Sequence, residues 1–100
     1  MLLRIFDNLI NNALKHGIGN LIISIDLAEN IQITFKNELY SSDIDINHIF
    51  DEFYTTDISR TKGNTGLGLA IVKQFTEMLR GSVSAEIQDG MLSVTVIFPI

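Results

Sequence analysis

The stretch GNTGLGLAIV, residues 63–72, places three glycines directly before a run of residues with helical character. Glycine is the poorest ordinary residue for starting a helix, because it loses the most backbone freedom when it becomes ordered. A chain accepts this cost in a loose loop, or where something must approach the backbone closely at the start of a helix. The second explanation predicts an anion site, since the first N–H groups of a helix and its dipole both attract negative charge.

Two familiar phosphate-binding patterns do not fit these glycines. The dinucleotide pattern requires a third glycine where this chain has Ile71, and it follows a strand rather than a polar segment. The P-loop pattern requires a lysine and a hydroxyl residue where this chain has Leu69 and Ala70. Taken alone, the segment is therefore better interpreted as a flexible glycine loop before an ordinary buried helix.

The composition indicates a single small domain. The chain has 100 residues, of which 46% are hydrophobic, and it carries a net charge of −5 and no cysteine. An acidic chain offers no broad surface for nucleic acid, and the absence of cysteine excludes disulfides and thiolate chemistry. No stretch is long and apolar enough to cross a bilayer, and charges come too early for a signal peptide. We therefore expect a cytoplasmic domain.

Hydrophobic periodicity predicts two helices and two hairpins. Apolar residues at helical spacing predict a helix over Leu2–Lys15, which Gly17 and Gly19 end, and a second helix over 67–80 that Gly81 caps. Alternating, β-branched segments over 20–27 and 30–37 predict one hairpin, and those over 82–88 and 91–99 predict another across Asp89-Gly90. This order predicts an α+β, two-layer α/β sandwich with helices on one face of a mostly antiparallel, mixed sheet.

The first helix carries a row of polar residues suited to a polyphosphate. At about 100° per residue, Asn8, Asn12 and Lys15 fall within an arc of about 60°. Asparagine is a middling helix former, and a solvated helix face more often carries Glu, Lys or Gln. The row therefore suggests amide oxygens and one ammonium group for a magnesium-bridged polyphosphate. An incidental surface position or a contact with a partner helix explains the two asparagines equally well at this point.

Together the segments resemble a known family. NLINNALKHG (8–17) resembles the N box, IFDEFY (49–54) the F box and GNTGLGLAIVKQF (63–75) the G2 box of the ATP-binding catalytic domain of sensor histidine kinases. These kinases belong to the wider GHKL group of ATPases, whose Bergerat fold is an α/β sandwich. The resemblance runs over nearly the whole chain, with the boxes in the family's order. It implies that residues 1–100 are one such domain, truncated at its N-terminal side.

The resemblance assigns roles to individual residues. It implies that Asn12 coordinates Mg²⁺ with help from Asn8, and that Lys15 reaches a phosphate of ATP. Hydrolysing relatives have a glutamate at the position of Asn8, and because an amide cannot act as a general base, transfer to a protein side chain is favoured over hydrolysis. The implied ATP-binding set is Asn8, Asn12, Lys15, Asn37, Tyr54, Arg60, Lys62, Gly63, Thr65, Gly66, Leu67, Gly68 and Leu69.

The segment 55–65 corresponds to the lid over the nucleotide. It is rich in Thr, Ser and Gly and has almost no apolar anchor, so we expect ATP to order it. Phe50, Phe53 and Tyr54 precede it and are expected to pack in the core, where they also anchor the lid.

Two features depart from the family's pattern. The G1 box usually has an aspartate that accepts a hydrogen bond from adenine and glycines beside it, whereas FKNELYSS (35–42) has neither, and Asn37 is the best match. A neutral acceptor loses the charge-assisted part of this bond, so weak nucleotide binding is expected. Neither His16 nor His48 lies in a motif like that of a phosphoacceptor, so we expect both to be structural.

The resemblance implies a larger sensor kinase of which this chain is a part. Its implied partners are ATP with Mg²⁺, a histidine-bearing dimerisation domain and a response regulator, and a membrane anchor would belong to parts of the parent outside this chain. A serine-kinase anti-sigma factor and a non-catalytic nucleotide-sensing module share the fold and remain alternatives. Alone, the chain is expected to bind ATP without autophosphorylation.

Overall fold

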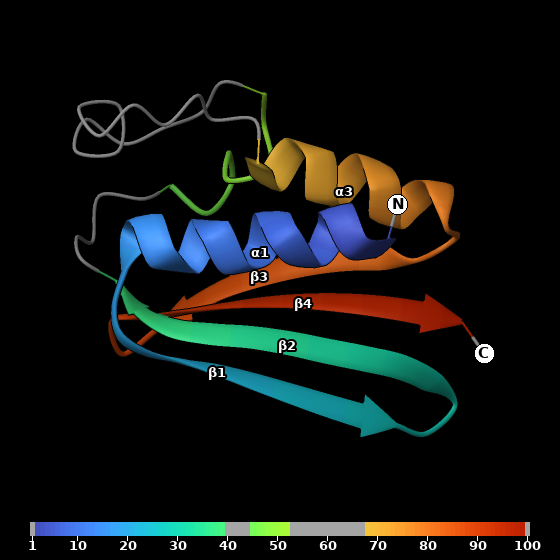
Figure 1. The fold of residues 1–100 in the computed structure, drawn as a ribbon, viewed down its shortest axis with the longest axis horizontal. Helices are drawn as coiled ribbons and strands as arrows, with labels where there is room; N and C mark the ends of the chain where they lie inside the picture. The colour runs from blue at the N-terminus through green and yellow to red at the C-terminus, as the bar shows by residue number, and fades with distance from the viewer. Residues whose placement is uncertain (1, 40–44, 53–67, 100) are drawn as a thin grey trace.

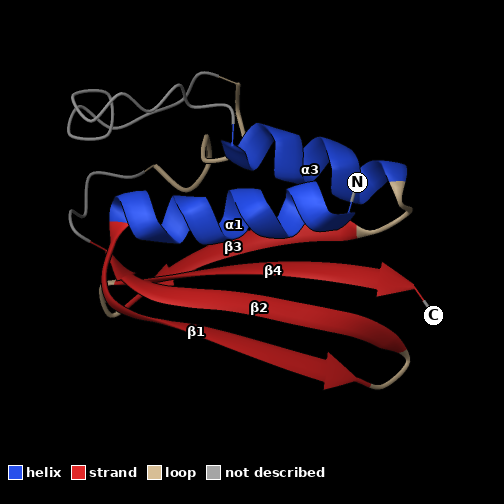
Figure 2. Ribbon diagram, in the orientation of Figure 1, coloured by secondary structure: helices blue, strands red, loops and turns tan. Residues whose placement is uncertain are grey.

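The protein folds into two layers, a sheet and a pair of helices that cover one of its faces (Figures 1 and 2). The computed structural model describes residues 2–39, 45–52 and 68–99. The helices are α1 (Leu2–His16) and α3 (Gly68–Met78). The strands are β1 (Gly17–Leu27), β2 (Asn30–Leu39), β3 (Ser82–Gln88) and β4 (Met91–Pro99). The predicted α/β sandwich is confirmed.

The sheet has the strand order β1-β2-β4-β3, and every pairing among these four strands is antiparallel. Both predicted hairpins are present, β1 with β2 and β3 with β4. In the second one, Asp89 and Gly90 have φ values of 54° and 75°, as a tight hairpin turn with two left-handed residues requires. The two hairpins join through β2 and β4, where Phe35 lies opposite Val94.

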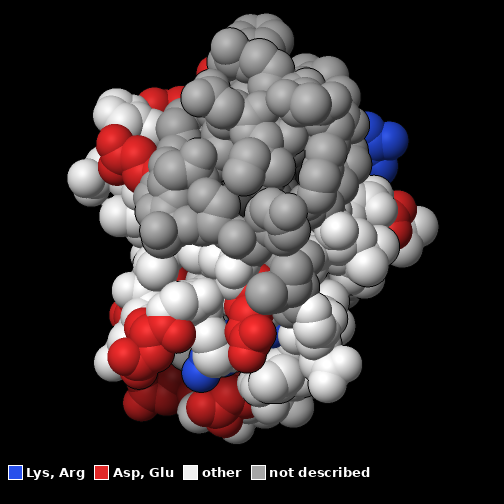
Figure 3. All heavy atoms as spheres, turned by 90° about the vertical axis from the view of Figure 1, so that its left-hand side faces the viewer, with Lys and Arg blue, Asp and Glu red and all other residues white. Residues whose placement is uncertain are grey.

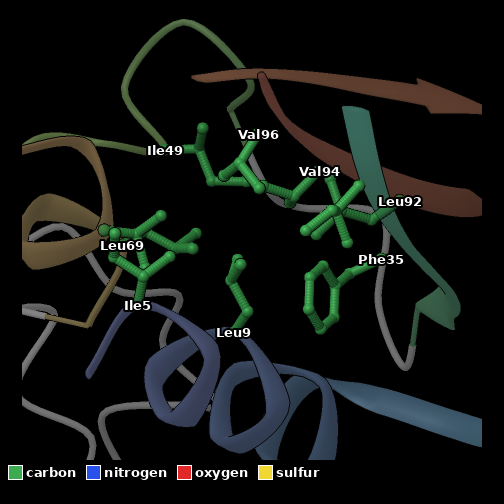
Figure 4. Close-up of a cluster of buried hydrophobic side chains, with 10 residues drawn as sticks. Ile5, Leu9, Phe35, Ile49, Leu69, Leu92, Val94 and Val96 are labelled. Atoms are coloured by element: carbon green, nitrogen blue, oxygen red, sulfur yellow. The ribbon is translucent and has the colours of Figure 1, made fainter. Parts of the chain in front are cut away.

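The core fills the space between the helices and the sheet (Figure 4). Helix α1 contributes Ile5, Leu9 and Ala13, which follow one another at a spacing of four residues and therefore share one face. Helix α3 buries Leu69, Val72 and Thr76, and β4 contributes its alternate residues Leu92, Val94 and Val96. Ile33 and Phe35 of β2 and Ile49 of the segment 45–52 complete the cluster. The helical and alternating patterns in the sequence thus mark the buried faces.

The element boundaries differ slightly from the prediction. Strand β1 begins at Gly17, three residues before the predicted start, and its register with β2 is irregular between Ile18 and Leu21. Gly19 has a φ of 72° within this irregularity. A left-handed residue interrupts the alternation of side chains, so the early part of β1 shows no strand pattern in the sequence.

The end of α3 also differs from the expectation that Gly81 caps it. The left-handed residue is Arg80, with a φ of 65°, and Gly81 follows it and donates its N–H to the carbonyl oxygen of Thr76 over 2.8 Å. This is the pattern of a Schellman motif whose left-handed position is not a glycine. Gly81 is required for a different reason, since a Cβ there would collide with the carbonyl oxygen of Ile97.

Candidate nucleotide site

The first helix and the start of the later helix meet at one point of the structure. Helices α1 and α3 pack side by side, and Gly68 is the first residue of α3. The Oδ1 atom of Asn8 lies 3.4 Å from the position that a Cβ on Gly68 would occupy. Asn8 and Gly68, sixty residues apart in the chain, are therefore neighbours at the start of α3.

Asn8 is held in a defined orientation. Its Nδ2 donates a hydrogen bond of 2.7 Å to the carbonyl oxygen of Arg4, one turn earlier in α1. This bond uses the amino side of the amide and leaves Oδ1 on the side of Gly68. Asn12 lies one turn further along the same flank of α1 and is half-buried. The flank therefore presents amide oxygens, which are the hard ligands that Mg²⁺ prefers.

Asn37 is a buried polar residue on the helix-facing side of the sheet. It is 4% exposed, and it shares this side with Ile33 and Phe35 because alternate residues of a strand point the same way. Its Nδ2 donates a hydrogen bond of 3.1 Å to the carbonyl oxygen of Glu38. The amino group of the Asn37 amide is thus already used by Glu38. The predicted contact of Asn37 with adenine stays a prediction.

Asn12 and Asn37 lie near the C-terminal ends of α1 and β2, whereas Asn8 lies in the middle of α1. In Figure 1 the C-terminal ends of α1 and β2 lie at the left end of the molecule, whereas α3 begins above the middle part of α1. Figure 3 shows this end from outside, and carboxylates predominate among its described charged side chains.

Several residues of the predicted site lie outside the described part of the chain. They are Tyr54, Arg60, Lys62, Gly63, Thr65, Gly66 and Leu67, together with the side chain of Lys15 and with Phe53 and the rest of the expected lid. Leu69 is described, and it is 8% exposed and packs in the core as expected of a residue that anchors the glycine segment. Phe50 is half-buried against the same core.

The structure also shows a hollow that the sequence did not suggest. It lies between α3 and the segment 45–52, with a volume of about 430 Å³, and it is lined by Phe50, Glu52, Ala70, Lys73, Gln74 and Glu77. The α3 residues of this set are Ala70, Lys73, Gln74 and Glu77. Their spacing of three and four residues places them on one face of the helix, and it is the only feature of the sequence that indicates the hollow. Of the residues assigned to ATP that the structure describes, none lines this hollow.

His48 takes part in a cluster of charges in the segment 45–52. Its Nδ1 lies 2.7 Å from Oδ2 of Asp51, and its Nε2 lies 3.8 Å from Oδ2 of Asp45. The hydrogen bond with Asp51, followed by the negative charges of Asp45 and Asp51, raises the pKa of His48 above its ordinary 6.5. His48 thus links both ends of this turn through Asp45 and Asp51, and its structural role stays a prediction.

Comparison with known proteins supports the interpretation from the boxes. The family described as histidine kinase-, DNA gyrase B- and HSP90-like ATPase matches residues 1–100. Sensor histidine kinase WalK of Bacillus subtilis is 37% identical over 95 residues, which cover 87% of this chain and 16% of that protein. This chain therefore spans about a sixth of the length of that curated relative.

Solved structures of low sequence identity share the fold. The mycobacterial sensor histidine kinase MprB aligns with a TM-score of 0.80 at 20% identity, over 96% of this chain and 70% of that one. Full-length ShkA in complex with AMPPNP aligns with a TM-score of 0.79 at 23% identity, over 98% of this chain and 21% of that one.

Among the described residues, no helix is long and apolar enough to cross a membrane.

Proposed function

The chain belongs to the family of histidine kinase-, DNA gyrase B- and HSP90-like ATPases, and from this premise we propose that it is the ATP-binding catalytic part of a sensor histidine kinase. The observation that carries the proposal is the contact between α1 and the start of α3. The Asn8 Oδ1 atom lies beside Gly68, so amide oxygens and the first N–H groups of a helix converge on one place. This is the combination that a magnesium-bridged triphosphate requires.

Each described residue has a role in this proposal. Asn12 and Asn8 hold Mg²⁺ through their amide oxygens, and Gly68 keeps the start of α3 open so that phosphate oxygens can approach its backbone. Asn37 accepts a hydrogen bond from adenine, and Leu69 anchors the glycine segment in the core. Mg²⁺, when bound, would neutralise negative charge that develops on the phosphates. The remaining members of the predicted set stay predictions.

The chemistry of Asn8 favours phosphoryl transfer over hydrolysis. A water molecule needs a base to become an effective nucleophile, and the amide of Asn8 cannot accept a proton at neutral pH. The γ-phosphoryl group would instead pass to an imidazole nitrogen of a histidine in a dimerisation domain, with ADP as the leaving group. A response regulator would accept it next. Both partners would belong to the longer protein and its signalling pair.

Binding of Mg-ATP to the whole 100-residue chain tests the site. We expect Mg-ATP to raise the free energy of unfolding, by about 2.7 kcal/mol when its concentration is a hundred times Kd, because it binds only the folded state. Asn12→Ala should remove most of this stabilisation, as should chelation of Mg²⁺ with EDTA. Thermal unfolding and calorimetric titration measure both effects.

Lys73→Ala is the matched control for this experiment. Lys73 is an exposed residue of α3 that lines the separate hollow rather than the candidate site. This variant should be stabilised by Mg-ATP as much as the unsubstituted chain. Equal responses of the two alanine variants would show that the assigned flank of α1 does not bind the nucleotide.

A further inference from the structure

The side-chain amide of Asn8 is oriented by the backbone of its own helix. One terminal atom of this amide lies 2.7 Å from the carbonyl oxygen of Arg4. A carbonyl oxygen only accepts hydrogen bonds, so the atom in contact with it must be the amino nitrogen Nδ2. The chemistry of the partner thus distinguishes the two amide atoms, although they are nearly alike in shape. The other atom, Oδ1, is the one beside Gly68.

The two ends of this amide therefore meet different elements. Nδ2 is bound to α1, and Oδ1 lies at the start of α3. Arg4 and Asn8 are four residues apart and share one side of α1, so the bond forms within the helix and needs no other element. Exchange of the two atoms by rotation of the amide would bring an oxygen against the carbonyl oxygen of Arg4. The bond to Arg4 therefore determines that an acceptor, and not a donor, faces Gly68.

We propose that Arg4, through its main-chain carbonyl, is a positioning residue of the nucleotide site, and that this contact requires an amide at position 8. The inference rests on the proposed function, since it concerns a group that faces Mg-ATP in that proposal. The amide donates with its amino group to Arg4 and presents its oxygen at the start of α3. A methyl side chain does neither, and an ionised carboxylate accepts but cannot donate.

The substitution Asn8→Asp separates the effect of orientation from the effect of charge. The two side chains have the same shape, but in the orientation of Asn8 one carboxylate oxygen would lie about 2.7 Å from the Arg4 carbonyl oxygen with no hydrogen between them. The side chain would turn away from Arg4 and carry its other oxygen away from Gly68. Attraction of Mg²⁺ to the new negative charge would act in the opposite direction. Orientation thus predicts weaker binding of Mg-ATP, whereas attraction of Mg²⁺ alone predicts tighter binding.

Calorimetric titration of the whole chain with Mg-ATP gives the first measurement. Asn8→Asp should weaken binding by about fivefold or more, which is the value of roughly one net hydrogen bond. It should bind no better than Asn8→Ala. Asn11→Asp is the matched control, because it makes the same change of charge at an exposed residue of α1 outside the predicted site. This variant should bind Mg-ATP like the unsubstituted chain.

The pKa of the new carboxyl group gives a second measurement, which needs no nucleotide. A protonated carboxyl is a donor, so it can replace the amino group at the carbonyl oxygen of Arg4. A hydrogen bond made by the neutral form raises a carboxyl pKa. The carboxyl introduced by Asn8→Asp should therefore have a higher pKa than the one introduced by Asn11→Asp. An NMR titration of the two variants compares these values directly.

The unsubstituted chain provides a third measurement, which does not depend on the folding of a variant. NMR should detect a scalar coupling across the hydrogen bond between Nδ2 of Asn8 and the carbonyl carbon of Arg4. Absence of this coupling would overturn the inference. So would binding of Mg-ATP by Asn8→Asp as tight as by the unsubstituted chain, or a carboxyl pKa in Asn8→Asp no higher than in Asn11→Asp. An unsubstituted chain that does not bind Mg-ATP would instead contradict the proposed function, while the coupling and the two pKa values would still test the orientation of Asn8.

Discussion

At the scale of single residues, Gly81 shows that a glycine can be required by space rather than by backbone freedom. Its neighbour Arg80 adopts the left-handed conformation that usually selects glycine, whereas Gly81 faces the carbonyl oxygen of Ile97 and the side chains of Thr76 and Phe98. An arginine in the left-handed region costs about 1 kcal/mol or more relative to glycine. The close approach of β4 thus determines which of the two positions is glycine.

Gly81→Ala should therefore destabilise the fold. The added Cβ would force the end of α3 away from β4, and overpacking of this kind costs typically about 1–3 kcal/mol. Gly68→Ala is the control, because its Cβ would meet the Asn8 Oδ1 atom at 3.4 Å, which is an ordinary contact. Urea unfolding measures both changes. A loss of stability in Gly68→Ala as large as that in Gly81→Ala would contradict this explanation.

His48 makes the stability of its turn dependent on pH. Asp51, through its hydrogen bond, and then the charges of Asp45 and Asp51 raise the pKa of His48 above 6.5. A raised pKa in the folded state means that protonation stabilises the fold. This contribution is complete below pH 6.5 and is lost as the pH rises through the folded-state pKa of His48.

We expect an NMR titration to give a pKa above 6.5 for His48 and a lower one in Asp51→Asn, which weakens the largest cause of the shift. Stability should fall as the pH rises above 6.5, and His48→Gln should lose this part of the pH dependence. His16 is the only other histidine, and it is unchanged in that comparison. A His48 pKa at or below 6.5 would show that the charge cluster does not act in solution.

At the scale of the elements, α1 presents three different sides. Its inner face buries Ile5 and Leu9, one flank carries Asn8 and Asn12 beside α3, and the opposite flank carries exposed leucines beside β1. Helix α3 is simpler, since Leu69, Val72 and Thr76 define one buried face. The proposed site therefore depends on how α1 is rotated, because a turn of the helix would remove the amide oxygens from the start of α3.

The same substitution on two sides of α1 tests this orientation. Leu9→Ala should cost about 2–5 kcal/mol of stability, because Leu9 is 2% exposed and its removal leaves a cavity in the core. Leu14→Ala should change stability by less than about 0.5 kcal/mol, because Leu14 is 74% exposed. Chemical unfolding gives both values. Similar losses in the two variants would place α1 in a different rotation.

At the scale of the whole molecule, the two layers divide the surface into separate regions. The meeting point of α1 and α3 is the candidate nucleotide site, and β1 lies at the end of the strand order. Carboxylates predominate among the described charged side chains of the end of the molecule that Figure 3 shows.

The sequence by itself determined the elements, and it predicts the site residues. Apolar spacing of four residues predicted α1, Asp89-Gly90 predicted the second hairpin, and the asparagines and glycines predicted the nucleotide site. These features depend on helical or strand periodicity and on local backbone angles, which a short segment specifies alone. The residues of 53–67 in that prediction lie outside the described part of the chain.

Only the tertiary structure decided which segments meet. The pairing of β2 with β4, the place of Asn8 beside Gly68, the burial of Asn37 and the exposure of the apolar side of β1 all depend on residues far apart in the chain. Alternation in β1 looks the same whether a helix covers it or not. Coverage depends on the limited width of two helices over four strands, and no local sequence pattern contains that information.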